Sequence, residues 1–509
     1  MGAITMRTSR RALVSPSRLR QIVFLSVLFL ALYCFLLVPD HSLDSSRPAM
    51  ADTYTFPNLH SNSHSSSYSS SSPSSNPKDK LPLSLLNNLH LTTSQCEASF
   101  PGLTHEISAA VSKGPFTLRR NPHGLGPTIL RIRDGRLYIL SHARRVDLSE
   151  AMLQHRSATL HQLANALLAA PPSEHPPLPD TILAFNHEDD PASPSLSYSR
   201  PADPSFDGPG RHVFPVPHFS FYAWPVPHVR SFPRAAASVA DLEARFPSWS
   251  AKDPRAVWRG TTWFNSARGG GRLRHELVLV AGRGKGKGKG GGGGEGEEEE
   301  KAWADVQPLA ANGSNALMIE DFCRYRYVIH TEGVTYSGRF QFHQLCASVV
   351  VAPPIAWMQH LTHLVRPAFS YQLEGVERVT PNNNDGGGGG NGNGNGRGKL
   401  LPYPAAWVKA AWPKEYDPSE ANIVFVAPDW SDLESTIAWL ERHPKIAEGI
   451  ARRQRELFHG GGYFSPAAEM CYWRALLRGW SEVVRTEGQG FENLEEIPWE
   501  EFSLKEIHK

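Results

Sequence analysis

Apolar residues occur along this chain in blocks of two lengths, and the longest block lies near the N-terminus. Residues 21–38 are uncharged and long enough to cross a bilayer as a helix. Five arginines precede the block and Pro39 and Asp40 follow it, so we expect a membrane anchor whose N-terminal side faces the cytosol. A cleaved signal peptide is the alternative interpretation.

Shorter apolar blocks, rich in β-branched and aromatic residues, predict buried strands. They fall at 181–186, 256–262, 325–330, 347–354 and 422–428. Towards the C-terminus the residues mark a pair of helix starts, Ser431 with Glu434 as a capping box and Ser465 with Pro466. Strands that alternate with helices predict α/β layers with parallel sheets.

Three polar tracts interrupt these blocks and have no hydrophobic period. Residues 39–90 begin with a run rich in Ser, Pro and Asn, which predicts a flexible stem. Residues 282–300 and 382–398 are Gly-rich, and we interpret both as surface insertions. Neither tract is typical of a phosphate loop, because no strand leads into it and no helix follows it.

Length, charge and cysteines limit the possible classes. The 509 residues suffice for two or three hydrophobic cores, and the formal charge of +2 gives no overall attraction to nucleic acid. Cys34 lies in the predicted anchor. The other four cysteines could form up to two disulfides in an oxidising lumen, in three possible pairings, or remain buried thiols. They are Cys96, Cys323, Cys346 and Cys471, and their spacing is not that of a zinc site.

A charged turn with two glycines separates two of the predicted strands. In the stretch YRYVIHTEGVTYSGRFQFHQLCASVVV, residues 325–351, we expect a strand, a turn, a helix beginning near Ser337 and a second strand. Ligands bind at the carboxyl ends of strands in open α/β sheets, and a helix N-terminus offers free N–H groups there. With the guanidinium of Arg339 this unit fits an anion, and a salt-bridged arginine at a helix start is the alternative.

A second basic cluster follows another predicted strand. Arg259 lies just before Gly260 at the end of this strand, and Arg268, Arg272 and Arg274 follow in a loop that leads into a helix. An arginine therefore lies at each of two strand ends. If the two ends face each other, their guanidinium groups could hold a diphosphate.

A third cluster is acidic and follows the strand at 181–186. Glu188, Asp189 and Asp190 are consecutive there. Carboxylates this close raise one another's pKa, which suits a general base. The alternative is a solvated acidic turn.

Six segments together resemble one enzyme family. They are QCEASFPGL, EDDP, WRGTTW, CRYRYVIHTEGVTYSGRFQFHQLCASVVV, VAPDWSDLESTI and SPAAEMCYWRALLRGW. In this order they are similar to the CAP10-type glycosyltransferases, glycosyltransferase family 90, and most of all to a fungal membrane-anchored branch. The family also includes protein O-glucosyltransferases and capsule-related xylosyltransferases. The resemblance extends over residues 91–484, apart from the Gly-rich insertions.

This resemblance implies an α/β architecture of the GT-B type. In that fold two Rossmann-like domains face each other across a cleft. The expected divisions are a cytosolic tail 1–20, an anchor 21–38, a stem 39–90, an N-terminal acceptor-side domain 91–250, a C-terminal nucleotide-sugar-binding domain 251–440 and C-terminal helices 441–509.

The resemblance also implies roles for individual residues. The catalytic base falls on Asp189, and its neighbour Asp190 is the alternative. Donor-binding residues are expected at Arg259, Gly260, Arg274, Glu332, Gly333, Ser337, Gly338 and Arg339. No metal or other cofactor is expected, because the chain has no Asp-x-Asp triplet of the kind with which metal-dependent GT-A enzymes hold a cation.

The implied function is transfer of xylose or glucose from a UDP-sugar to a hydroxyl of a glycan or protein acceptor, with inversion. We expect a single-pass type II protein of the Golgi or ER membrane whose catalytic part is lumenal. Asn312, in the sequon Asn-Gly-Ser, is then a glycosylation acceptor. The alternative is a non-catalytic carbohydrate-binding or scaffolding protein that retains the fold.

Overall fold

The structure is a computed structural model, and it describes residues 81–120, 126–208, 210–263, 272–283, 302–379, 400 and 402–507. The predicted cytosolic tail and anchor, most of the stem, most of the insertion 282–300 and all of the insertion 382–398 lie outside these residues. Within the described ranges no helix has both the length and the apolar character that crossing a membrane requires.

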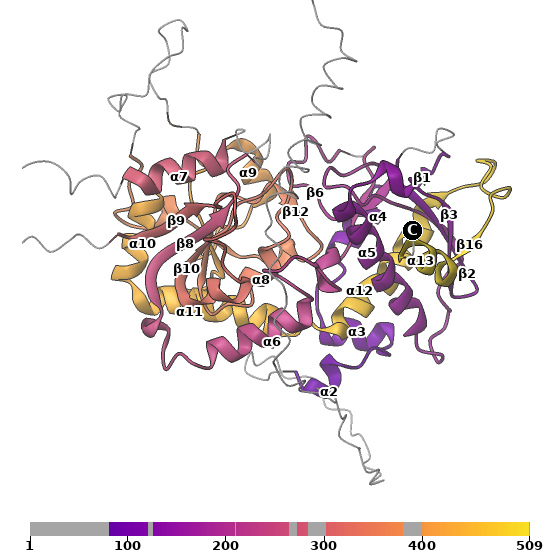
Figure 1. Cartoon of the computed structure of the whole chain (residues 1–509), viewed down its shortest axis with the longest axis horizontal. Coiled ribbons are helices and arrows are strands. Elements are labelled where there is room, and N and C mark those ends of the chain that lie inside the picture. Colours follow the sequence, from indigo (N-terminus) through magenta and orange to yellow (C-terminus); the bar gives the residue numbers. More distant parts are fainter. Residues whose placement is uncertain are drawn as a thin grey trace, which may run out of the picture. The chain divides into compact units, whose positions relative to one another are not determined.

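One sheet, here called the C-terminal sheet, has six strands that all run parallel, in the order β13-β14-β11-β10-β8-β9 (Figure 1). Its strands confirm four of the predicted apolar blocks as strands. They are β8 Asp253–Gly260, β9 Ala304–Pro308, β10 Tyr325–Ile329, β11 Val349–Ala352, β13 Pro367–Phe369 and β14 Ile423–Phe425.

The C-terminal sheet is buried on both faces, which explains why its strands read as continuous apolar runs. Val257 and Val328 pack into one hydrophobic core, whereas Tyr327, Ile329 and Val351 pack into a second core on the opposite face. Helices surround this sheet (Figure 1). They include α7 Leu273–Arg283, α10 Leu433–Arg442 and α11 Pro444–Arg455.

A second six-stranded sheet, the N-terminal sheet, has the order β16-β3-β2-β4-β5-β7. Its strands are β2 Thr128–Arg133, β3 Arg136–Ser141, β4 Thr181–Phe185, β5 Ser195–Ser197, β7 Val213–Pro215 and β16 Ile497–Pro498. Strands β4, β5 and β7 run parallel, but β2 is antiparallel to both β3 and β4. This mixed sheet departs from the all-parallel arrangement that a Rossmann-like domain would have.

The reason for the departure is a tight hairpin between β2 and β3. Asp134 and Gly135 form its turn, with φ of 51° and 70°. An Asp-Gly pair with both residues at positive φ is typical of the two-residue hairpin turn that joins antiparallel strands. The sequence carried this signal at residues 134–135.

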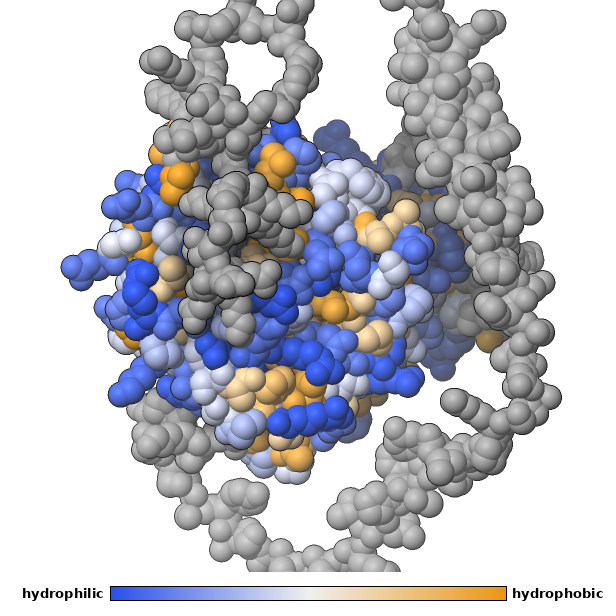
Figure 2. All heavy atoms as spheres, turned by 60° about the vertical axis from the view of Figure 1, so that its left-hand side comes forward, coloured by the Kyte–Doolittle hydropathy of each residue, from blue (hydrophilic) through white to orange (hydrophobic). Residues whose placement is uncertain are grey.

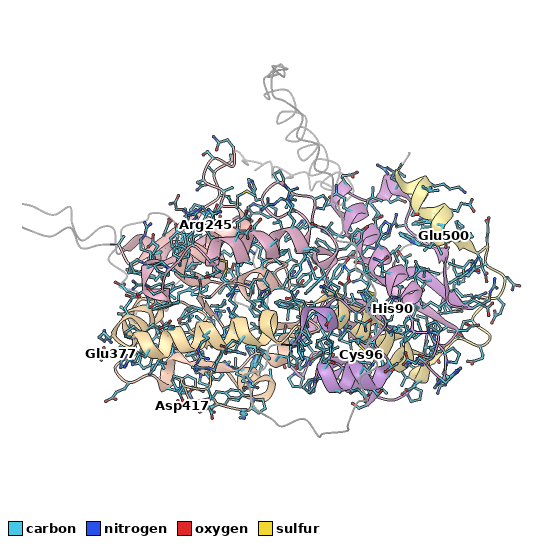
Figure 3. All side chains as sticks on the ribbon, turned by 90° about the horizontal axis from the view of Figure 1, so that it is seen from below. His90, Cys96, Arg245, Glu377, Asp417 and Glu500 are labelled. Atoms are coloured by element: carbon cyan, nitrogen blue, oxygen red, sulfur yellow. A yellow bond between two sulfur atoms is a disulfide. The ribbon has the colours of Figure 1, made fainter. Side chains whose placement is uncertain are left out.

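The C-terminal segment returns to the N-terminal sheet. Helix α12 Pro466–Val483 packs against α3 Thr93–Ser99, α4 His105–Val111 and α5 Glu150–Leu168. Its Cys471 is disulfide-bonded to Cys96 of α3, which is labelled in Figure 3. Strand β16 and helix α13 Trp499–Ile507 then add to the β3 edge, where Figure 1 places the C-terminus.

The remaining elements are short or connect the two sheets. The helices are α2 Leu83–Leu86, α6 Phe232–Glu243, α8 Phe340–His343 and α9 Ala406–Ala411, and the strands are β1 Phe116–Thr117, β6 Arg200–Pro201, β12 Trp357–Met358 and β15 Val484–Arg485. The 3₁₀ helices include η2 Phe219–Phe221 and η5 Ile319–Arg324. Antiparallel pairing of β6 with β12 joins a segment between β5 and β7 to one that follows β11.

The two predicted helix starts had different outcomes. Ser465 caps α12 as predicted, since its side chain accepts the N–H of Ala468. The capping box at Ser431 is wrong, because α10 begins two residues later and the Ser431 hydroxyl donates to Asp429 at 2.6 Å. The N-cap residue of α10 is Asp432, which accepts the N–H of Ala427.

Candidate active site

One cavity of about 420 Å³ lies where strands of both sheets end. Its charged residues include Asp189 in the loop after β4, Arg259 at the end of β8, Arg274 in the first turn of α7 and Arg339 in the turn after β10. Eight of the nine predicted site residues line it, and Glu332 does not. The eight are Asp189, Arg259, Gly260, Arg274, Gly333, Ser337, Gly338 and Arg339.

A larger cavity, of about 710 Å³, lies elsewhere and contains none of the predicted residues. Leucines of α2 and residues of α6 and α11 line it. On the face seen in Figure 2 most of the surface is hydrophilic, and apolar residues form separate patches. Because eight of the predicted site residues line the smaller cavity and none lines the larger one, we assign the candidate site to the smaller one.

Arg339 brings a positive charge that no described carboxylate neutralises. Its Nη1 donates to the carbonyl oxygen of Arg259 at 2.5 Å, and its guanidinium lies 5.8 Å from the ring centroid of Phe322. Burial lowers the pKa of Arg339 to about 10, so the side chain still carries its charge at neutral pH. A half-buried cation of this kind favours an anionic ligand.

Arg274 adds a second positive charge to the same cavity. Its Nε donates to the carbonyl of Glu332 at 3.0 Å and its Nη1 to the carbonyl of Thr261 at 3.2 Å. Burial, and then the charge of Arg339, lower the pKa of Arg274 to about 9. The two guanidinium groups therefore repel each other, and an anion between them would relieve this repulsion.

Two buried histidines beside these arginines remain neutral. Burial, followed by the charges of Arg339 and Arg274, lowers the pKa of His330 to about 3. The pKa of His343 also lies well below its ordinary value, first through burial and then through Arg339. The positive charge of this region thus resides on the two arginines.

Arg259 has a different environment from the one predicted. Its Nη2 pairs with both carboxylate oxygens of Asp305 at 2.9 and 3.0 Å, and its Nε donates to the carbonyl of Asn315. Burial opposes the charge of Asp305, yet hydrogen bonds from Arg259, Tyr325 and Gln307 hold its pKa at about 2. In this structure the guanidinium of Arg259 is bound to Asp305, and the backbone carbonyl of Arg259 accepts a hydrogen bond from Arg339.

Asp189 lies in the loop after β4 and carries the carboxylate of the cavity. Asp189 is exposed to solvent, although the protein on its other sides removes enough water to raise its pKa above the ordinary value. A hydrogen bond from Tyr336, at 3.2 Å, acts in the opposite direction. Asp190 does not line the cavity, and residues 188–190 form a bend.

Glu332 is buried behind the cavity. Its Oε1 accepts the N–H groups of Ala356 at 3.1 Å and Trp357 at 2.9 Å. Burial raises the pKa of Glu332 to about 8, although the two N–H groups oppose the rise. These contacts join the turn 331–339 to the chain after β11, a structural role that the sequence did not indicate.

The predicted helix after the turn is shorter than expected. Helix α8 has only four residues, Phe340–His343, so it lacks the length that a strong helix dipole requires. Ser337 is buried, and its hydroxyl lies 3.5 Å from the N–H of Arg339. The anion-binding character of this unit therefore comes from the arginines rather than from a helix N-terminus.

Gly338 has a steric reason to be glycine. A Cβ atom at this position would lie 2.6 Å from Cε1 of His218 and 3.1 Å from Cζ3 of Trp224. Such distances are shorter than normal contacts, and both neighbours are rings. The turn that carries Arg339 consequently fits against the segment after β7 only without a side chain at residue 338.

Sequence reasoning missed the wall that faces these arginines. It is formed by residues from α5 and from the segment after β7, together with one from the turn itself. They are His155, His218, Phe219, Trp224, Val226, His228, Val229 and Tyr336. The available signal was the aromatic-rich run HFSFYAWPVPH, residues 218–228, which follows a strand.

The described residues contain one group of potential metal ligands within reach of one another. It consists of Glu243, Cys323 and Cys346, and the two cysteines form a disulfide. The group does not line the candidate cavity.

Comparison with known proteins supports the resemblance seen in the motifs. Residues 120–372 match the family model "Glycosyl transferase family 90". A curated protein of Anopheles gambiae, named O-glucosyltransferase rumi homolog, is 23% identical over 238 residues, which is 47% of this chain. The matched part is 44% of that relative, so the chain spans less than half of its length. The matched family region contains the loop of Asp189, the β8 end and the turn 331–339.

Proposed function

Because residues 120–372 belong to glycosyl transferase family 90, we propose that this protein is a UDP-sugar-dependent glycosyltransferase. It moves xylose or glucose to a hydroxyl of a glycan or protein acceptor, with inversion. One observation carries the proposal. A single cavity holds Arg339, which has no carboxylate partner among the described residues, together with the carboxylate of Asp189.

In the proposed reaction the acceptor oxygen forms a bond to the anomeric carbon while the bond from that carbon to UDP breaks. Asp189 accepts the proton of the acceptor hydroxyl, and its raised pKa makes it a stronger base than an ordinary aspartate. The diphosphate leaves with a developing negative charge. Arg339 and Arg274 stabilise this charge as fixed donors in a water-poor site.

Arg259 has an indirect part in this proposal. Its guanidinium is bound to Asp305, and its carbonyl oxygen fixes Nη1 of Arg339. We therefore propose that the diphosphate is neutralised by Arg339 and Arg274, without a metal ion or other cofactor. Glu332, Gly333, Ser337 and Gly338 shape the turn that presents Arg339.

The proposed location is the lumen of the Golgi or ER, behind the predicted anchor at 21–38. All four cysteines of the predicted lumenal part are paired, Cys96 with Cys471 and Cys323 with Cys346. Disulfides persist in oxidising compartments, which supports this location. Asn312 is exposed, as a glycosylation acceptor must be.

The test is release of UDP by the purified protein from UDP-glucose and UDP-xylose. We expect slow hydrolysis of one of them without acceptor. Asp189→Asn removes the proton acceptor and should lower turnover with an acceptor by about 10²- to 10⁴-fold, with UDP affinity unchanged. Asp190→Asn is the matched control, because Asp190 does not line the cavity.

Two results would contradict the proposal. Full turnover by Asp189→Asn, together with loss of turnover in Asp190→Asn, would show that Asp190 and not Asp189 is the base. Absence of UDP release and of UDP binding in the wild-type protein would instead favour the non-catalytic carbohydrate-binding protein.

A further inference from the structure

Two hydrogen bonds join Asp189 to the turn that carries Arg339. The Thr335 hydroxyl donates to the backbone carbonyl of Asp189 at 2.8 Å, and the Tyr336 hydroxyl donates to Oδ1 of Asp189 at 3.2 Å. The bonded residues lie 146 and 147 positions apart in the chain. They connect the loop after β4 of the N-terminal sheet with the turn after β10 of the C-terminal sheet.

Both donors are held firmly by their surroundings. Thr335 is 2% exposed and Tyr336 7% exposed. The Tyr336 ring packs at 5.3 Å from His218 and 6.0 Å from Tyr198, and the N–H of Gly333 closes the turn on the carbonyls of both donors. Burial keeps the pKa of Tyr336 well above its ordinary value, so its hydroxyl remains a donor.

The carboxyl of Asp189 depends on this donor for its orientation. Asn186 holds the backbone of the loop, since its Nδ2 donates to the carbonyls of Glu188 and Asp190. That contact does not reach the carboxyl. Among the described residues, Tyr336 provides the only hydrogen bond to the Asp189 side chain.

From these contacts we infer that Tyr336 and Thr335 are positioning residues for the base. Thr335 fixes the backbone of Asp189, and Tyr336 occupies Oδ1, so that Oδ2 faces the acceptor hydroxyl. Arg339 lies on the same turn, three residues after Tyr336. The turn therefore sets the distance between the base and the site of the leaving diphosphate. This inference rests on the proposed function and assigns a task to two residues of the turn for which no individual role was predicted.

Tyr336→Phe in the full-length protein tests the inference. The Tyr336 hydroxyl stabilises the charged form of the carboxylate, so its loss should raise the pKa of Asp189. We expect the acid limb of kcat/KM against pH to move to higher pH. The lost orientation should also lower kcat by about 10-fold, which is the low end for a hydrogen bond to a charged group. UDP affinity, measured by calorimetry, should stay within about twofold of wild type, because Tyr336 does not contact the diphosphate in this proposal.

Tyr198→Phe is the matched control. Tyr198 is also a buried tyrosine, but its hydroxyl bonds Thr159 and the carbonyl of His155 instead of Asp189. The acid limb of kcat/KM against pH for Tyr198→Phe should coincide with that of wild type. An unmoved acid limb in Tyr336→Phe, or an equal shift in Tyr198→Phe, would overturn the inference.

Thr335 gives a second test that does not alter the cavity aromatics. Thr335→Val removes the donor to the Asp189 backbone at nearly constant volume and should lower kcat, whereas Thr335→Ser keeps the hydroxyl and should restore it. Equal kcat in the Val and Ser variants would contradict the role of Thr335.

Turnover by Asp189→Asn separates two claims, that Asp189 is the base and that Tyr336 positions it. If that variant is active, the assigned base is wrong. If it is inactive while Tyr336→Phe is unchanged, only the positioning role is wrong.

Discussion

At the scale of single residues, Arg339 and Arg259 lie beside each other but meet different partners. Arg339 faces the cavity without a described carboxylate, so Arg339→Ala should weaken UDP binding directly. A charged hydrogen-bonding partner contributes on the order of 1.5–3 kcal/mol, and calorimetric titration with UDP measures the loss. The melting temperature should stay near wild type, since the variant removes a charge that burial disfavours.

The control for Arg339→Ala is Arg324→Ala. Arg324 lies on η5, pairs with Asp321 at 2.7 Å and does not line the cavity. Its loss should leave the UDP affinity unchanged. A folded Arg339→Ala protein with wild-type UDP affinity would show that the diphosphate binds elsewhere.

Arg259→Ala should produce the opposite pattern, with a loss of stability as its first effect. The variant leaves the buried carboxylate of Asp305 without its ionic partner. Removal of one member of a buried pair typically costs about 3–5 kcal/mol, which denaturant unfolding can measure. Arg259→Ala with Asp305→Asn should recover part of this loss, because the second change removes the unpaired charge. A fully stable Arg259→Ala would instead assign Arg259 to ligand binding alone.

At the scale of elements, the turn 331–339 acts as one unit because its backbone fits tightly against the segment after β7. Gly338→Ala would place a Cβ 2.6 Å from the His218 ring, so the turn or the ring must move. Overpacking of this kind costs about 1–3 kcal/mol. We expect a lower melting temperature together with weaker UDP binding, because Arg339 follows directly in the chain.

Gly210→Ala is the matched control for this change. A Cβ atom at Gly210 would meet nothing within 4 Å. Its melting temperature and UDP affinity should equal those of wild type. If Gly338→Ala also left both quantities unchanged, the close approach of the turn to His218 would matter neither for stability nor for UDP binding.

The elements also show what could be predicted and what could not. Strands β4, β8, β10, β11 and β14 followed from local apolar runs, and the structure brings Asp189 and Arg339, which follow two of these strands, into one cavity. The partner of Arg259 could not be predicted, because Asp305 reaches it through the pairing of β8 with β9, on the far side of a Gly-rich insertion. The aromatic wall was missed for a similar reason. Aromatic residues in a loop are equally compatible with a buried core and with the wall of a cavity. The sequence alone does not show how the two sheets pack together, which decides between them.

At the scale of the whole molecule, the C-terminal elements α12, β16 and α13 return to the N-terminal sheet and its helices. The division at residue 441 treated the C-terminal helices as a separate region. In the structure α12 packs on α3, α4 and α5, and Arg474 of α12 donates to the carbonyls of Leu89 and Leu91. The apolar spacing of α12 predicted a buried helix but could not show which sheet it covers, since that depends on contacts between distant segments of the chain.

The disulfide between Cys96 and Cys471 secures this return over 375 positions, whereas the one between Cys323 and Cys346 spans only 23. A disulfide stabilises mainly by restricting the unfolded chain, and the effect grows with the logarithm of the loop length. Removing the long-range disulfide by double replacement with serine should therefore cost about 2.5 kcal/mol more than removing the short one, from the ratio of the two loop lengths. Denaturant unfolding of the two double variants measures this difference. Equal losses would mean that the contacts of Arg474 already hold the N-terminal segment in place. A larger loss for the short disulfide would mean that its main effect is on the native packing of η5 beneath Arg339.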